Sequence, residues 1–204
     1  MNWKNIKQNI NTEKRNLAIA GLLLVVLAFG GFLTLNSQVE SRDYELQLQN
    51  QLSQGDGGQD LIVFSHYRCP HCRSFYNDTY PKLKQEYSFT VHHINYPVLS
   101  EGSVYIAKAS ECAYRQRGDE AWSYHMKMMT ENMTDGQQVV EAYGGNQSKL
   151  ASCIGETSEN QLSNQRLVHD IRLAQSRGYQ GTPVILLDGE RISPEYEAIS
   201  SALK

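Results

Sequence analysis

Two cysteines separated by two residues carry the clearest chemistry in this chain of 204 residues. They stand in the motif Cys69-Pro70-His71-Cys72, directly after a short apolar run that is typical of a buried strand. Two thiols at this spacing in the first turn of a helix can close a small disulfide ring and open it again. The motif therefore predicts a redox-active pair that exchanges disulfides with other thiols.

The two cysteines are expected to differ in acidity. In the first helical turn, Cys69 would face main-chain amides without helical partners and the positive end of the helix dipole, which both favour a thiolate. His71, inside the ring, would add positive charge or a hydrogen bond. A lowered pKa of Cys69 stabilises the reduced pair, so the disulfide form becomes a strong donor. Cys72, deeper in the helix, is expected to be the resolving thiol.

Other chemistries for the pair remain open. A structural zinc site needs four ligands, but Cys112 and Cys153 stand alone in the sequence, and only His66 and His71 could supplement the pair. A c-type haem site needs histidine directly after the second cysteine, where this chain has Arg73. A purely structural disulfide is a further alternative, although so short a loop stabilises a fold little. No metal or cofactor is predicted.

Periodicity and turn signals predict the elements that position the pair, in the order of an α/β fold. Helices within 101–177 are expected to end at the glycines Gly118, Gly144 and Gly178. The expected elements are a strand at 61–64, a helix at 73–87 kinked at Pro81, a strand at 89–96, the helices within 101–177, a strand at 184–187, a hairpin turn at Asp188-Gly189, and a short helix capped by Ser193 with Pro194 at its first position.

Two groups of residues have mainly structural interpretations. His92 and His93 are adjacent on a predicted strand, so their side chains point to opposite faces, and we expect them at the surface or half-buried. Trp122, Met126 and Met129 recur at helical spacing and are expected to pack in a core.

Residues 17–35 form a run of 19 uncharged, mostly apolar residues. As a helix this run would reach about 28 Å, close to the thickness of a bilayer core. Lysine and arginine precede it, and the positive-inside rule then places residues 1–16 in the cytoplasm and the chain after residue 35 outside it. The exit lacks an Ala-x-Ala pattern, so an uncleaved anchor is favoured over a cleaved signal peptide. The polar, glycine-rich stretch 36–59 is expected to be a flexible tether before a domain at 60–204.

Composition excludes several classes of protein. The net charge is −3, and the body of the chain has no basic stripe, which argues against nucleic-acid binding. With 40% hydrophobic and 20% charged residues, the chain is not of the disordered class.

The motif around Cys69, the long helical segment and the late Gly181-Thr182-Pro183 together resemble the DsbA-like branch of the thioredoxin superfamily. The resemblance covers roughly residues 60–204 and implies a thioredoxin fold with an inserted helical subdomain at 100–177. It implies that Pro183 is a cis-proline lying against the active-site disulfide, and that the backbone of Thr182 pairs with a substrate strand. Members usually have a strand before the one at residue 61. Only residues 44–48 offer a weak candidate, so the sheet is expected to be one strand short or irregular there.

The resemblance also makes a structural disulfide between Cys112 and Cys153 credible, since some DsbA-like proteins have one in the insertion. An even cysteine count in an oxidising compartment favours the same pairing. Two free thiols, or a second redox pair that relays electrons, remain the alternatives.

These observations predict a membrane-anchored thiol–disulfide oxidoreductase of the bacterial inner or cell membrane, with its catalytic domain periplasmic or extracellular. It is expected to donate disulfides to exported proteins that carry cysteines. The resemblance implies a membrane partner of the DsbB or vitamin-K-epoxide-reductase (VKOR) type that reoxidises it. Two alternatives are a reductase or isomerase with the same site, and a non-catalytic metal-binding or assembly factor on the same scaffold.

Overall fold

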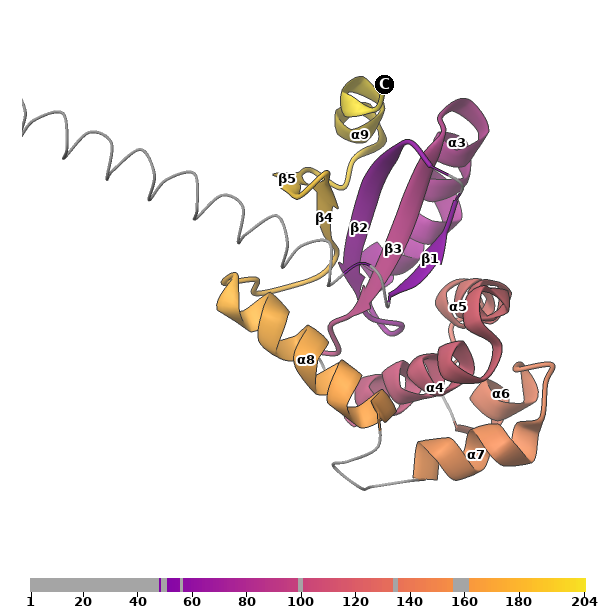
Figure 1. The fold of residues 1–204 in the computed structure, drawn as a ribbon. Coiled ribbons are helices and arrows are strands. Elements are labelled where there is room, and N and C mark those ends of the chain that lie inside the picture. The colour runs from indigo at the N-terminus through magenta and orange to yellow at the C-terminus, as the bar shows by residue number, and fades with distance from the viewer. Residues whose placement is uncertain (1–47, 49–50, 56, 99–100, 134–135, 156–161) are drawn as a thin grey trace, which may run out of the picture. The chain divides into compact units, whose positions relative to one another are not determined.

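Five strands form one mixed sheet in the part of the chain that the structure describes (Figure 1). Their order across the sheet is β1 (Leu52–Gln54), β3 (Phe89–Asn95), β2 (Gln59–Ser65), β4 (Val184–Leu187) and β5 (Glu190–Ile192). Strands β2 and β3 are parallel, and every other neighbouring pair is antiparallel. The central strand β2 aligns Leu61 with Val91 on one side and with Leu187 on the other.

This computed structural model describes residues 48, 51–55, 57–98, 101–133, 136–155 and 162–204. Residues Asn50–Lys204 make up a compact unit that contains the predicted redox motif. Within the described residues, no helix has both the length and the apolar character needed to cross a membrane. The cytoplasmic segment predicted at 1–16 and the anchor predicted at 17–35 lie outside the described residues.

Both faces of β2 are covered, which explains why its sequence is a continuous apolar run rather than an alternating one. Leu61 and Val63 belong to the main core cluster, together with side chains of the helices on that face. On the opposite face, Phe64 packs edge-to-face on Tyr179 with ring centroids 5.1 Å apart. The site that follows β2 is therefore built on a rigid, buried strand.

The edge strand β1 corrects two expectations. The sheet is not a strand short, because Leu52–Gln54 pairs with β3 inside the segment expected to be a flexible tether. The glycines after it lie close to main chain: a Cβ at Gly55, where φ is +142°, would collide with Phe89, and one at Gly58, where φ is +80°, would collide with Ser88. Their role is close approach to the start of β3 rather than flexibility.

Removing this segment is expected to weaken the domain. Leu52 is buried in the core, and the preceding Gln51 donates to Asp170 over 3.0 Å and accepts from Arg166 over 3.1 Å. A fragment starting at residue 59 should therefore be roughly 2–4 kcal/mol less stable than one starting at residue 50. Urea unfolding of the two fragments measures the difference, and equal midpoints would show that β1 contributes nothing.

The helix after β2 consists of three consecutive segments on one side of the sheet. They are α2 (Pro70–Ser74), a π-helical turn η1 (Phe75–Thr79) and α3 (Tyr80–Glu86). In the π-turn the amide of Tyr80 donates to the carbonyl of Phe75, five residues back. The next residue, Pro81, has no amide to donate. The irregularity expected at Pro81 thus takes the form of a π-turn placed immediately before it.

The helical insertion lies between β3 and β4 and gathers at one end of the sheet (Figure 1). Positive φ values at Gly118, Gly144 and Gly178 confirm three predicted helix stops. The last helix, α9, has Glu195 at its N-cap position, without a capping hydrogen bond from that side chain, so the predicted cap by Ser193 is wrong. The helical segments of the insertion, with the C-terminal helix, are α4 (Glu101–Arg117), η2 (Gly118–Glu120), α5 (Ala121–Thr130), α6 (Gly136–Glu141), α7 (Gln147–Gly155), α8 (Leu162–Ser176) and α9 (Tyr196–Ala202).

Cys112 of α4 and Cys153 of α7 form the disulfide that the resemblance implied, with their Cα atoms 6.0 Å apart. The hydroxyl of Ser163, which is buried in α8, lies 3.8 Å from the first sulfur and 3.6 Å from the second. The bond therefore joins α4 to α7, with α8 in contact with it through Ser163, and neither sulfur is free to act as a metal ligand.

Loss of this disulfide is expected to destabilise the insertion. The bond spans 41 residues of sequence. Closing a loop of this length is worth about 4 kcal/mol in the chain-entropy model. The double variant Cys112→Ala with Cys153→Ala should lose stability of that order in urea unfolding under oxidising conditions. An unchanged unfolding free energy would contradict a stabilising role.

Candidate active site

Cys69 occupies the N-cap position of α2, with Pro70 at the first helical position. Its Sγ accepts a hydrogen bond from the amide of Cys72 over 3.3 Å. Its own amide donates to the carbonyl of His66 over 3.1 Å, which fixes the turn between strand and helix. The free amide at the helix start thus faces the first sulfur, as the sequence predicted.

Cys69 and Cys72 are both free thiols in the structure. Their pKa values are shifted in opposite directions. A hydrogen bond from the Cys72 thiol is the largest of the effects that lower the pKa of Cys69 from 9.0 to about 5; a hydrogen bond with Thr182, the Cys72 amide and the electrostatic interaction with the His66 ring act in the same direction. Burial raises the pKa of Cys72 far above its ordinary value. Cys69 is therefore a thiolate at neutral pH and Cys72 a thiol.

The loop before β4 completes the site. The Thr182–Pro183 peptide bond is cis, as the resemblance implied. The Sγ of Cys69 lies 3.3 Å from the carbonyl oxygen of Thr182. This contact joins residues 113 positions apart in sequence, and it places the cis-proline loop directly beside the first cysteine.

A groove of about 340 Å³ opens beside this loop. It is lined by His71 and Phe75 from the redox helix, by Thr182 and Pro183 from the loop, and by further residues that include Asp78 and Glu195. His71 is exposed, so a ligand in the groove would lie next to the disulfide ring. The arrangement suits an extended chain that presents a sulfur to Cys69.

A thioredoxin family model matches residues 54–204. The chain belongs to the thioredoxin family. Among curated relatives of this thioredoxin-family chain, a probable disulfide bond formation protein D of Bacillus anthracis is 24% identical over 166 residues, covering 76% of each chain. Disulfide bond formation protein D of Bacillus subtilis is 24% identical over 165 residues, covering 75% of this chain and 74% of the relative.

Solved structures share the fold. Oxidised BdbD from Bacillus subtilis superposes with a TM-score of 0.67 at 19% identity, over 76% of this chain and 91% of that one. DsbA from Chlamydia trachomatis gives a TM-score of 0.62 at 18% identity, over 76% and 88%. The family match and these relatives identify the chain as a DsbA-like thiol–disulfide oxidoreductase.

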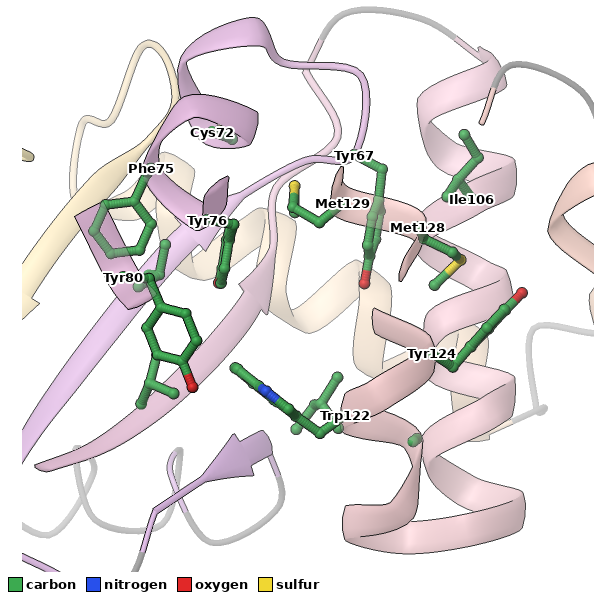
Figure 2. Close-up of a cluster of buried hydrophobic side chains, with 14 of the residues drawn as sticks. Tyr67, Cys72, Phe75, Tyr76, Tyr80, Ile106, Trp122, Tyr124, Met128 and Met129 are labelled. Carbon is green, nitrogen blue, oxygen red and sulfur yellow. The ribbon is translucent and has the colours of Figure 1, made fainter. Parts of the chain in front are cut away.

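The core of this thioredoxin-family domain continues from the sheet into the insertion beneath the redox helix. Figure 2 shows aromatic side chains of that helix facing those of α5. Tyr80 and Trp122 meet with ring centroids 5.9 Å apart, and Tyr76 packs edge-to-face on His125 at 5.0 Å. Trp122 and Met129 are buried, as their helical spacing predicted, and Met126 packs against the same core.

His92 and His93 point to opposite faces as expected, but the expectation that they lie at the surface or half-buried is wrong, because both are buried. His92 Nε2 lies 2.9 Å from Asp60 Oδ1. His93 has Ser65 Oγ 3.1 Å from its Nδ1 and Asn95 Oδ1 3.0 Å from its Nε2. Polar partners inside the sheet, which strand periodicity cannot show, make this burial possible.

His93 and His125 pack against each other beneath the redox helix, with ring centroids 4.2 Å apart and the ring planes tilted by 48°. Burial lowers the pKa of His93 from 6.5 to about 4 and that of His125 well below its ordinary value. Both rings are therefore neutral at neutral pH. This pair could not be predicted from the sequence, because residues 93 and 125 come from a strand and a helix that only the fold brings together.

His66 is the other site residue whose role the sequence did not reveal. Sequence analysis considered it only as a supplementary metal ligand. The structure buries it between β2 and α2, with its carbonyl bonded to the amide of Cys69. Its position three residues before the first cysteine was the available signal. In the described residues, no group of three or more potential ligand side chains is arranged to hold a metal ion.

Proposed function

We propose that this protein donates disulfides to exported polypeptides from the Cys69–Cys72 pair. A substrate thiolate attacks the Sγ of Cys69, Cys72 leaves as the reduced partner, and a second substrate thiol releases the substrate as a disulfide. The pair is left as a dithiol and needs an oxidant. A membrane protein of the DsbB or VKOR type would reoxidise it.

The unequal acidity of the two thiols is the observation that carries this direction. A thiolate exists only in the reduced form, so every factor that stabilises the Cys69 thiolate favours reduction of the protein and oxidation of its substrate. At pH 7, a pKa of about 5 in place of 9.0 stabilises the dithiol enough to raise the reduction potential by roughly 60 mV. The names of the Bacillus relatives, which refer to disulfide bond formation, agree with this direction.

The groove beside the cis-proline loop would hold the substrate. Its apolar lining comes from Phe75, Pro183 and Pro194, and the other lining residues are polar. An extended segment that pairs with the main chain of Thr182 would bring its cysteine to Cys69, whose sulfur already touches this residue. Main-chain recognition of this kind accepts many sequences, which suits an enzyme with varied substrates.

We place the catalytic domain outside the cytoplasm, held by an uncleaved helix at 17–35. The support is the run of 19 uncharged residues, with Lys4, Lys7, Lys14 and Arg15 before it and Arg42 as the only lysine or arginine in the 20 residues after it. A disulfide within the insertion fits an oxidising compartment as well. Resistance of the protein to carbonate extraction from membranes tests the anchor, and release into the soluble fraction would contradict it.

The reduction potential of the full-length protein in detergent tests the direction. The pair is equilibrated with glutathione buffers, and the dithiol fraction is measured by alkylation. We expect a potential above about −200 mV, in the range of protein disulfide donors. A value near −270 mV, typical of thioredoxin itself, would make the protein a reductase. The double variant Cys112→Ala with Cys153→Ala should give the same potential, since those sulfurs lie outside the redox pair.

A further inference from the structure

His66 is a buried histidine with an unused hydrogen-bonding atom beside the redox pair. Its side chain is 1% exposed, and its Nδ1 is buried without a hydrogen-bond partner in the structure. A buried ring nitrogen without a partner is costly, so a position that keeps one calls for an explanation.

The main chain of His66 contacts both cysteines of the pair. Its carbonyl accepts from the amide of Cys69 over 3.1 Å, and a main-chain hydrogen bond from His66 acts on the Cys72 sulfur. The ring also interacts electrostatically with the Cys69 thiolate. Burial, the largest effect, lowers the pKa of His66; the Cys69 charge raises it, and exposed Arg68 lowers it further. The ring is thus neutral at pH 7 and able to take up a proton.

Closure of the disulfide requires a group that accepts the proton of the Cys72 thiol. Bulk water cannot reach this buried thiol to accept the proton directly. Cys72 has no exposed surface, and burial keeps it protonated. Its thiol must lose a proton as it attacks, because the thiolate is the nucleophile. Two other buried histidines lie near the helix. His93 is bonded through both nitrogens. His125 is bonded to Tyr67 through Nδ1 over 2.8 Å and also keeps a buried Nε2 without a partner, but the group that acts on its charge is His93 and not the redox pair.

We propose that His66 is the proton acceptor for Cys72 when the pair is reoxidised. Cys69 first forms a mixed disulfide with an oxidising disulfide, releasing one thiolate. The Cys72 sulfur then bonds to the Cys69 sulfur, the bond from Cys69 to the oxidant sulfur breaks, and the oxidant leaves as its second thiolate. The Cys72 proton passes to the ring of His66. The reverse transfer returns a proton to Cys72 when a substrate opens the ring. This inference rests on the disulfide exchange assigned to the pair and identifies its acid–base group.

The test follows reoxidation of the reduced full-length protein by glutathione disulfide. At saturating oxidant, the limiting rate reports closure of the ring and not formation of the mixed disulfide. In the wild type, we expect this rate to level off by neutral pH. His66→Asn keeps a polar atom near the Nδ1 position but no base. It should lower the rate at pH 7 about a hundredfold, the usual contribution of a general base, and leave it rising with pH up to 9. A superimposable pH profile would overturn the proposal.

The exposed histidine of α8 provides a matched control. The side chain of His169 is 55% exposed, so His169→Asn makes the same chemical change away from the pair and should leave both rate and profile unchanged. Failure of the wild type itself to form the Cys69–Cys72 disulfide would overturn the proposed function. A normal wild type with an unaffected His66→Asn variant would overturn only the inference.

A second readout does not depend on the variant being folded. Because the Cys69 thiolate raises the pKa of His66, the ring should titrate at a lower pH in the oxidised wild type than in the reduced one. Two-dimensional ¹⁵N spectra of the imidazole nitrogens over pH 4–8 measure both titrations. Identical titration curves in the two redox states would show that the ring does not sense the pair.

Discussion

Replacing Cys69 by serine is expected to abolish disulfide exchange, with a loss of at least about a thousandfold, because a serine hydroxyl is not ionised near neutral pH and cannot form the mixed disulfide. Cys72→Ser should behave differently. Cys69 keeps the amide of residue 72 as a hydrogen-bond donor and still reacts, but nothing resolves the product. A mixed disulfide with substrate should therefore accumulate.

The two serine variants are controls for one another, since each removes one sulfur from the same ring. Reaction with a cysteine-bearing peptide disulfide, followed by non-reducing electrophoresis and intact-mass analysis, distinguishes them. We expect an adduct with Cys72→Ser and none with Cys69→Ser. The opposite result would mean that Cys72 is the attacking thiol, which its complete burial argues against.

Acid is expected to destabilise the domain through the buried pair His93 and His125. Their pKa values are lowered in the folded state, so the unfolded chain binds more protons below its own histidine pKa of about 6.5. Stability is therefore complete above pH 6.5 and falls as the pH drops towards the folded pKa of His93, about 4. For His93 alone the loss over this window is about 3 kcal/mol, and His125 adds to it with the same sign.

Glu111 works against this trend, because burial raises its pKa to about 7. The folded state binds its proton first, so Glu111 stabilises the fold increasingly as the pH falls from 7 to 4.5. The contribution of the histidines is therefore isolated by comparing His93→Gln with the wild type in urea unfolding at pH 7, 5.5 and 4.5. The variant should lose less stability on acidification.

The control is again His169, whose pKa is raised by its hydrogen bond to Asp170. A raised pKa stabilises the fold below pH 6.5, so His169→Gln should make the acid-induced loss slightly larger rather than smaller. Parallel stability profiles for the wild type and His93→Gln would show that the buried pair does not set the acid response.

Local signals in the sequence predicted most of the elements that build the site. The apolar run at 61–64, the positive-φ glycines and the Asp188-Gly189 turn act within a few residues, and each lies where it was predicted. From the sequence alone, only the family resemblance predicted that the redox motif and the cis-proline loop lie next to each other. Their contact joins residues 113 apart, and no local pattern carries that information.

The errors of the sequence reading share one physical cause. The segment around Gly55 was taken for a tether because glycine permits flexibility, whereas here it permits close approach to the main chain of β3. His92 and His93 were expected near the surface because histidine is polar, yet Asp60, Ser65 and Asn95 satisfy them inside the fold. In both cases the deciding partner comes from a distant segment.

The two outer strands of the sheet are each only three residues long. Strand β5 carries exposed Glu190 and Arg191, and β1 leads into glycines held against β3. Polypeptides that still carry free thiols are largely unfolded, and such chains add readily to long, uncharged sheet edges. Edges this short and partly charged offer little template for that addition. An enzyme that donates disulfides to unfolded exported chains, as proposed above, would thereby be protected from aggregating with them.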